Sequence, residues 1–308
     1  MILVAGGTGF IGKAIVRQLV GRGREVAVLS HGARGSSLTL DGKRVEVRPG
    51  DVTDLASLPA TLAGVDTVVG AVQFKDFPNQ NPGRGLTFDN MDRRGTENLV
   101  AAARAAGVAR FVYISGAGAA PDAEKVWFRA KWGAETAVRE SGMRALIVRP
   151  SWVYGPEDRA LNRYVAFVRS PLPVVPVIGT GKQRLQPVFV EDVARLVADS
   201  LDGKGAAEGT FEIGGPQVLT MDEVIREVER ALGKTKPLVH QPVWLMKTLF
   251  APKALLPALP IPLTPEGLEF ATMDATAETA PLLTAFPELR LTPLREGLAT
   301  YLGSRQSA

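Results

Sequence analysis

Short apolar runs alternate with longer amphipathic segments through the first half of the chain. This alternation is typical of βαβ units built around a parallel sheet. In FIGKAIVRQLVGRG, for example, Ile11, Ile15 and Leu19 recur every four residues and predict a helix, as does the alanine-rich RGTENLVAAARAAG. The apolar runs predict six strands, at residues 2–5, 26–29, 45–48, 67–71, 111–115 and 145–149. The order of these elements predicts an α/β fold with a doubly wound parallel sheet.

After Pro150 the pattern changes. SPLPVVPVIGTG predicts a proline-rich loop, QPVFVEDVARLVADSLD a short strand and a helix, and GTFEIGG one more strand. TMDEVIREVERALG predicts a helix with a capping box formed by Thr220 and Glu223. The proline-punctuated tail, residues 235–308, predicts a small, mostly helical lobe. We therefore expect a nucleotide-binding domain from residues 1–155 with 184–215, and a smaller substrate or partner lobe from 156–183 with 216–308.

Composition narrows the possible partners and chemistry. The 308 residues carry 36 basic and 32 acidic side chains, for a formal net charge of +4, with no polybasic run that would indicate nucleic acid binding. The chain has no cysteine, which excludes disulfides and thiolate catalysis. With only His31 and His240 in addition, we expect no metal site.

The ends of the chain bear on localisation. The first strand begins at residue 2 and leaves no room for a cleavable signal, so we expect a cytoplasmic protein. The apolar stretch 243–263 contains four prolines and two lysines, which argues against a transmembrane segment. That stretch fits either a packed lobe or a face that contacts a protein partner or a membrane surface.

A glycine-rich turn follows the first predicted strand. GGTGFIG places Gly6, Gly9 and Gly12 between this strand and the first helix. Such spacing permits a tight turn, a close approach of the backbone to a pyrophosphate, and close packing of helix on strand. The helix then presents free N–H groups and its positive dipole end to the anion. We expect this Rossmann-type loop to bind a dinucleotide, with Thr8, Phe10 and Ile11 as further contacts.

The ends of the next strands bear on which dinucleotide binds. The second strand ends in Ser30, where NAD-binding sites usually carry an acid. Ser30, His31 and Arg34 could instead donate to a 2′-phosphate, which favours NADP over the alternative, NAD. Ser30 and Arg34 could also be ordinary loop residues. Further cofactor contacts are expected at strand ends: Asp51 and Val52 beside the adenine, and Ala71 and Val72 beside the pyrophosphate.

Several motifs together resemble one family. GGTGFIG, GDVTD, GTENLVAAARAAGV, FVYIS, Lys131 with the following GAE, and RPSWVYGPED span residues 2–158 and resemble the extended and atypical short-chain dehydrogenases/reductases, which include NAD-dependent epimerases and dehydratases. Within that family, GPEDRALNRY, QPVFVEDVA and PALPIPL are most similar to the NAD(P)-binding accessory subunit of respiratory complex I and its bacterial relatives.

The resemblance implies catalytic positions, and the chain matches them only in part. The family uses a Tyr and a Ser or Thr to protonate a carbonyl, and a Lys that binds the nicotinamide ribose and lowers the Tyr pKa. Lys131 matches the lysine, but Trp127 occupies the Tyr position, and an indole N–H does not titrate usefully. The Ser or Thr position falls on Ala117, and a polar position of the fourth helix falls near Asp92.

Other residues near the expected nicotinamide are weighed as replacements. Tyr154 could serve as an acid or could simply be a packing residue, and Tyr113 fits the core of a strand. Ser115 is expected to contact the cofactor or to end its strand. Pro150, Trp152 and Val153, after the sixth strand, are further expected cofactor contacts.

Two functions follow from these positions. The first is a protein that holds NADP(H) in a structural, redox-linked or complex I-related role, with a partner contacting the tail. The second is an NAD(P)H-dependent oxidoreductase, or a sugar-nucleotide epimerase or dehydratase, with an unconventional acid such as Tyr154. A redox-sensing regulator without turnover is a third possibility. Whether the chain is an enzyme is left open by the sequence.

Overall fold

One large sheet organises the molecule. The computed structural model describes residues 1–31, 37–250 and 264–303, so the predicted contact Arg34 and the PALPIPL segment lie outside the described residues. The strand order in the sheet is β12-β7-β6-β5-β1-β2-β4-β3, and every neighbouring pair is parallel except the antiparallel pair β3 and β4. The strands are β1 (Ile2–Ala5), β2 (Val26–Ser30), β3 (Ser37–Leu40), β4 (Lys43–Pro49), β5 (Thr67–Gly70), β6 (Arg110–Ile114), β7 (Arg144–Pro150) and β12 (Gly209–Ile213).

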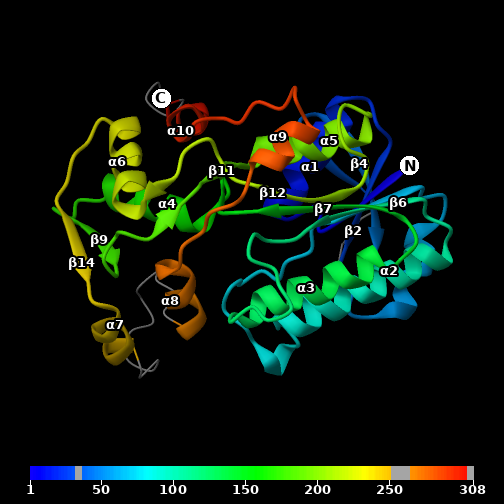
Figure 1. Ribbon diagram of the computed structural model, residues 1–308, viewed down its shortest axis with the longest axis horizontal. Coiled ribbons are helices and arrows are strands. Elements are labelled where there is room, and N and C mark those ends of the chain that lie inside the picture. The colour runs from blue at the N-terminus through cyan, green and yellow to red at the C-terminus, as the bar shows by residue number, and fades with distance from the viewer. Residues whose placement is uncertain (32–36, 251–263, 304–308) are drawn as a thin grey trace.

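Helices cover both faces of this sheet (Figure 1). Helices α1 (Phe10–Gly21) and α5 (Val190–Leu201) lie together on one face, and α2 (Gly95–Ala105) and α3 (Val126–Arg139) lie on the other. Strands β1, β5 and β6 are buried along their whole length, as expected for a parallel sheet that is covered on both sides. The predicted doubly wound fold is confirmed.

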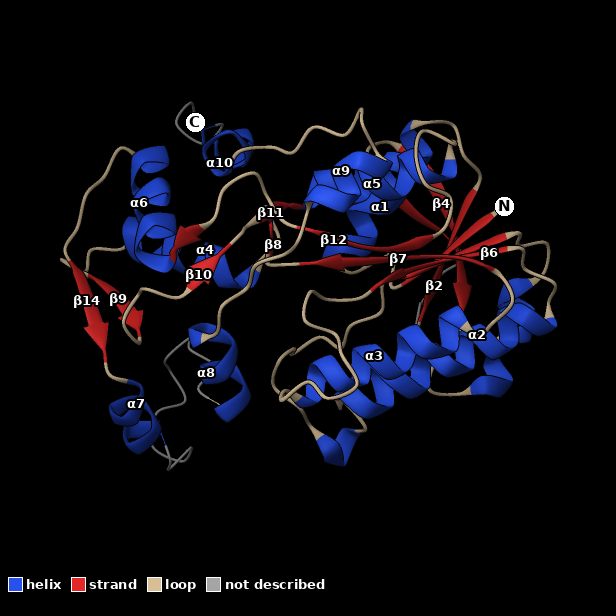
Figure 2. Cartoon of the chain, viewed as in Figure 1, coloured by secondary structure: helices blue, strands red, loops and turns tan. Residues whose placement is uncertain are grey.

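A second group of elements lies beyond the end of the sheet, on the left of Figure 2. It contains α4 (Arg159–Arg169), α6 (Met221–Leu232), α7 (Val243–Phe250), α8 (Pro265–Thr272) and the parallel pair β9 (Val175–Ile178) and β14 (Leu238–Gln241). A short pair, β8 (Val153–Tyr154) with β11 (Val188–Phe189), lies between this group and the sheet. A second pair joins β10 (Arg184–Leu185) to β13 (Leu219–Thr220), and β13 leads directly into α6. The capping box at the start of α6 is present as predicted.

The last two helices connect the two groups. Helix α9 (Ala280–Ala285) packs on β12 of the large sheet, and α10 (Leu294–Leu302) packs on α6. The division into 1–155 with 184–215 and 156–183 with 216–308 stays a prediction. Within the described residues, no helix combines the length and the apolar character needed to cross a membrane.

Some local predictions were wrong. SPLPVVPVIGTG is not only a loop, because β9 forms within it and pairs with β14, a strand in the tail that was expected to be helical. Strand β3 was missed, since its alternating exposed pattern at the sheet edge carries no continuous apolar run. Before α2 the chain forms 3₁₀ turns at Leu55–Ser57, Pro59–Leu62 and Pro82–Arg84 and a π-helix, η4, at Phe88–Arg94.

Candidate functional site

The glycine turn after β1 is fixed by close backbone contacts. Gly6 has a φ of +81°, and a Cβ there would lie 2.4 Å from the carbonyl oxygen of Ala71. At Gly12 a Cβ would lie 2.2 Å from the carbonyl oxygen of Gly6. Real Cβ atoms do not approach oxygen so closely, so both positions require glycine. The turn therefore brings the ends of β1 and β5 into contact at one edge of the sheet, with Val72 beside it.

The start of α1 is open to an anion. Gly9 is the N-cap, no side chain caps the helix, and its first turn has no acidic residue. Thr8 and Gly9 are exposed, and Phe10 and Ile11 are partly so. Unopposed N–H groups and the positive end of the helix dipole favour a phosphate at such a position. The residues at this turn thus fit the diphosphate of a dinucleotide.

The segment after β7 lies against this turn. A Cβ at Gly155 would lie 3.1 Å from the ring of Phe10, so the two residues are in contact. Lys13 Nζ also lies 2.6 Å from Glu157 Oε2. Of the contacts expected here, Pro150 is buried at the end of β7, Trp152 is partly buried in the following loop, and Val153 is partly buried at the start of β8. The predicted contacts at the ends of β1, β5 and β7 thus lie along one edge.

The ends of β2 and β4 also meet. His31 Nδ1 lies 2.8 Å from Asp51 Oδ2, while Thr53 donates from its N–H (2.8 Å) and its hydroxyl (2.7 Å) to Asp51 Oδ1. Ser30 ends β2 directly beside this pair. Val52 is 4 % exposed and packs against Gly95. Of the two residues expected beside the adenine, Asp51 is bound by His31 and Thr53. The side chain of Val52 belongs to the core.

Lys131 is enclosed below the same edge. Its Nζ lies 2.9 Å from Asp92 Oδ1 and 3.3 Å from the carbonyl oxygen of Ile114. The ammonium also stands 5.1 Å from the ring centre of Tyr113. Lys131 is 3 % exposed and Asp92 1 %. The expected ribose ligand therefore already has a carboxylate partner, which η4 supplies.

The electrostatics of this pair are those of a buried ion pair. Burial would lower the pKa of Lys131, but Asp92 and then Tyr113 outweigh that effect and hold the pKa above its ordinary value. Burial raises the pKa of Asp92 above its ordinary value, although Lys131 and the indole of Trp127 oppose the shift. Burial likewise raises the pKa of Tyr113. Tyr113 is 2 % exposed and fits the core role expected for it.

Trp127 belongs to an aromatic cluster. Because it precedes Lys131 by one helical turn on α3, the two side chains share a face. The indole ring centre lies 5.2 Å from that of Phe77 and 5.3 Å from that of Phe270, and the ring covers Gly116. Phe74 and Phe88 pack against Phe77 on the other side. Trp127 is therefore a packing residue of this cluster.

Helix α8 holds Phe270 in that cluster. Glu269 forms an ion pair with Lys125, and the Thr264 hydroxyl, which caps α8, hydrogen-bonds to Asn79. The Gln183 side chain donates to the carbonyl of Ala271 at 2.7 Å. These contacts join α8 to the start of α3, to the loop after β5 and to the segment before β10. The aromatic cluster is thus closed by an element from the tail.

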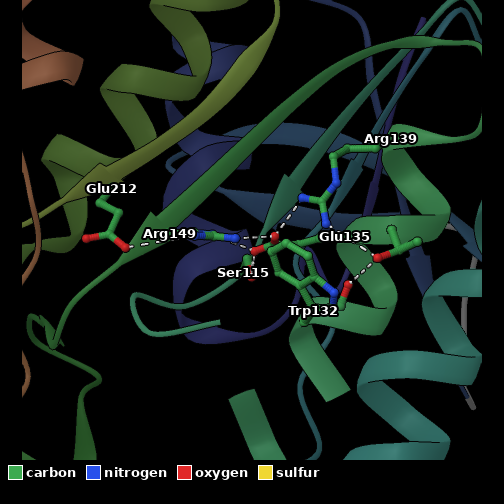
Figure 3. Close-up of polar contacts among 7 residues, drawn as sticks. Ser115, Trp132, Glu135, Arg139, Arg149 and Glu212 are labelled. Atoms are coloured by element: carbon green, nitrogen blue, oxygen red, sulfur yellow. Dashed lines mark hydrogen bonds and ion pairs between the residues drawn. The ribbon is translucent and has the colours of Figure 1, made fainter. Parts of the chain in front are cut away.

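Ser115 points into a buried network rather than toward the sheet edge. Its hydroxyl donates to Glu135 Oε1 at 2.6 Å, and Glu135 is fully buried on α3 (Figure 3). Arg149 donates to both Glu135 oxygens, at 2.8 and 2.6 Å, and Arg139 donates to Oε2 at 2.8 Å. Hydrogen bonding to Glu135 holds the pKa of Arg149 above its ordinary value. Ser115 directly follows the end of β6, and its expected contact with the cofactor stays a prediction.

Tyr154 is buried beneath α10. It is fully buried, its ring packs 5.4 Å from that of Phe189, and a Cβ at Gly297 in α10 would lie 2.0 Å from its hydroxyl. Burial, followed by the nearby carboxylate of Asp192, raises its pKa far above the ordinary value. Alternation along β8 directs Tyr154 beneath α10, where its side chain packs in the core.

The residues that close this half of the site were not expected from the sequence. Glu135 follows Lys131 by four residues, a spacing that places both on the buried face of α3. That signal was present in the sequence. The partners Phe77 and Phe270 had no comparable signal, because only the tertiary fold brings the loop after β5 and α8 to Trp127.

Comparison with known proteins agrees with this geometry. Residues 6–203 match a family described as NAD(P)H-binding. The chain belongs to this family. It is an atypical short-chain dehydrogenase/reductase related to a complex I subunit, and its sheet edge is that of an NAD(P)-binding fold.

The similar curated proteins include subunits of NADH dehydrogenase and an azoreductase. The chain is 32 % identical over 267 residues, 84 % of its length, to NADH dehydrogenase [ubiquinone] 1 alpha subcomplex subunit 9, mitochondrial, of Arabidopsis thaliana, of which it spans 65 %. It is 28 % identical to the NADH-ubiquinone oxidoreductase 40 kDa subunit of Neurospora crassa, covering 80 % of this chain and 64 % of that protein. It is 31 % identical to an NAD(P)H azoreductase of Xenophilus azovorans, over 76 % of this chain and 74 % of that protein.

Solved structures with the same fold include the UDP-glucose 4-epimerase of Thermus thermophilus in complex with NAD. The match covers 100 % of this chain and 99 % of that one, with a TM-score of 0.74 and 22 % sequence identity. At this identity the likeness shows the fold.

Proposed function

We propose that this protein holds an NADP(H) molecule at the glycine turn in an accessory, redox-linked role and does not carry out carbonyl reduction by the Tyr-based route of its family. One observation carries the proposal: Trp127, which stands where the resemblance places the family's Tyr, packs with Phe77 and Phe270. An indole cannot supply the proton that reduction of a carbonyl requires. The second position, Ala117, also lacks a hydroxyl.

The buried lysine supports the same proposal. In Tyr-based catalysis the ammonium must face both the ribose and the phenol, whereas Lys131 is paired with Asp92 at 2.9 Å. Its side chain is 4 % exposed. We infer that it balances the buried carboxylate, a role in which removing either partner is costly.

The choice of NADP over NAD rests on the ends of β2 and β4. An acid at the end of β2 would bind a ribose 2′-hydroxyl and repel a 2′-phosphate, and Ser30 has no charge. The one carboxylate beside it, Asp51, is paired with His31. We infer that this corner accepts a 2′-phosphate, with the side chains of Ser30 and His31 as donors.

Partners of the complex I type are part of the proposal. The relatives named as complex I subunits are longer, and this chain spans about two thirds of each. We propose that the tail, which closes the aromatic cluster through α8, also provides the contact with a protein partner.

A second function has one observation in its favour. The azoreductase relative covers three quarters of this chain, so an NAD(P)H-dependent oxidoreductase remains the alternative. Hydride transfer belongs to the cofactor when it is bound, and the chain would have to place a substrate and a proton source. Tyr154 is not that source, because it is fully buried under α10.

Nucleotide content and affinity test the proposal. The purified protein is analysed by mass spectrometry for bound nucleotide, and NADPH and NADH are then titrated into nucleotide-free protein. We expect bound NADP(H) and tighter binding of NADPH than of NADH. Gly9→Val, which places a side chain where the diphosphate approaches, should abolish binding, whereas Gly21→Ala at the far end of α1 should not. Binding of neither nucleotide by the wild type would refute the proposal.

A further inference from the structure

Helix α4 carries a cation that forms no hydrogen bond or ion pair with the described residues. Arg163, in the GPEDRALNRY motif, is partly buried, and it takes part in no hydrogen bond, ion pair or ring contact with them. Every other lysine or arginine whose side chain the structure describes as partly or fully buried has a hydrogen-bonding or ion-pairing partner. Those residues are Lys13, Arg17, Arg22, Arg48, Arg93, Arg110, Lys125, Lys131, Arg149, Arg195, Arg226 and Lys236.

Asp158, the carboxylate that acts on Arg163 electrostatically, and Asn162, which precedes Arg163 on α4, hydrogen-bond to backbone groups instead. Asp158 caps α4 by accepting from the N–H groups of Ala160 (3.0 Å) and Leu161 (2.8 Å). Asn162 uses its amide to donate to the carbonyls of Gly155 and Asp158. Burial lowers the pKa of Arg163 below its ordinary value, and the opposing influences of Tyr164 and then Asp158 do not offset it. A guanidinium held in this way loses hydration without gaining an anion.

The face on which Arg163 lies is fixed by its neighbour. Arg159 precedes it by one helical turn, so the two side chains lie on one side of α4. Arg159 donates to the carbonyl of Lys75 at 2.8 Å and approaches Asp76 Oδ1 at 3.7 Å. Both partners lie in the loop that leaves the carboxyl end of β5, and the exposed ammonium of Lys75 has no interaction with the described residues. Ligands of doubly wound sheets bind outside these carboxyl ends.

We propose that Arg163 binds the carboxylate or phosphate group of a small ligand beside the loop after β5, at a position separate from the dinucleotide diphosphate. A guanidinium binds either group through paired N–H donors. The diphosphate is expected at the start of α1, whereas Arg163 lies on α4. Arg163 would thus bind a second, anionic ligand in addition to the proposed nucleotide. This proposal does not depend on whether the nucleotide is turned over.

Calorimetric titration of inorganic phosphate and of succinate, at constant ionic strength and with NADPH saturating, tests the proposal. The variants are Arg163→Gln, Arg163→Lys and, as a control with the same loss of charge on the same helix face, Arg159→Gln. We expect binding of at least one probe to the wild type, weakened about tenfold in Arg163→Gln because one charge-assisted pair is lost. Arg159→Gln should stay within about twofold, and Arg163→Lys should retain part of the affinity.

Several outcomes would overturn the proposal. These are no binding of either probe to the wild type, equal weakening in Arg163→Gln and Arg159→Gln, or phosphate binding that disappears once NADPH is present. Thermal melting without probes separates folding from binding: Arg163→Gln should melt no lower than the wild type, because no native contact is lost. A marked drop would show a structural role for Arg163 and contradict the proposal. The same titrations run without NADPH keep this result independent of nucleotide binding.

Discussion

Two stretches of the same sheet edge are built in opposite ways. Around the glycine turn, Thr8 and Gly9 are exposed and no side chain caps α1. Around α3, Lys131 and Asp92 are 3 % and 1 % exposed, and the ring of Trp127 packs with those of Phe77 and Phe270. The two stretches therefore differ in what they can offer a ligand: the glycine turn presents backbone N–H groups, whereas the side chains around α3 are engaged with one another.

Removing one partner of the buried ion pair between Asp92 and Lys131 should have the largest effect, on the free energy of unfolding. Asp92→Ala should lower the free energy of unfolding by about 3–5 kcal/mol, because it leaves Lys131 buried without a counter-charge. Urea denaturation measures this. The control, Asp92→Leu with Lys131→Met, removes both charges and should recover much of the loss. An unchanged unfolding curve for Asp92→Ala would mean that the ion pair is not buried as described.

A change in the glycine turn should lower the affinity for NADPH. Gly12→Ala forces a Cβ against the carbonyl oxygen of Gly6, at 2.2 Å, and displaces the turn. Overpacking of this kind costs roughly 1–3 kcal/mol, so NADPH affinity should fall by up to about a hundredfold. Gly21→Ala, with no atom within 4 Å of its added Cβ, is the matched control in the same helix. Equal NADPH affinity in Gly12→Ala and Gly21→Ala would contradict the assignment of nucleotide binding to the glycine turn.

A smaller effect is expected at Ser115. Ser115→Ala removes one donor from Glu135, which keeps its bonds to Arg149 and Arg139. The free energy of unfolding should fall by about 1–3 kcal/mol, and NADPH affinity should change less than about twofold. Fluorescence titration and urea denaturation give the two values. A large loss of affinity without a loss of stability would place Ser115 in the nucleotide site after all.

Almost no effect on turnover is expected at Trp127. Trp127→Tyr restores the family's phenol, yet we expect no gain in NADPH oxidation, since Asp92 already pairs with Lys131 and the neighbouring Phe77 and Phe270 remain. Steady-state assays with carbonyl substrates measure this. Rapid turnover in this variant would show that one residue separates the chain from its catalytic relatives.

The glycine turn and the helix after it were predictable because their physics is local. Gly6, Gly9 and Gly12 are neighbours in sequence, and α1 begins directly at Phe10. The doubly wound parallel sheet followed from the alternation of short apolar runs and amphipathic segments. By contrast, β9 forms in a proline-rich stretch because β14, distant in sequence, offers it a partner.

For the buried region around Lys131 and Trp127, the sequence predicted only which residues stand at the positions that the resemblance implies. Trp127 and Ala117 are visible in the sequence, but what surrounds them is not, because Asp92 comes from a π-helix and Phe270 from the tail. Tyr154 could be weighed as an acid only until its facing was known. A one-residue change of facing on a strand moves a side chain to the other side, and no local pattern at β8 decides it.

A nucleotide that is held without passing hydride by the family's route should be inert toward added acceptors. To test this, the protein is loaded with one equivalent of NADPH and mixed with quinones, azo dyes and carbonyl compounds while the absorbance of reduced nicotinamide is followed. We predict oxidation no faster than that of free NADPH with each compound. Faster oxidation by any of them, lost in Gly9→Val, would contradict the account.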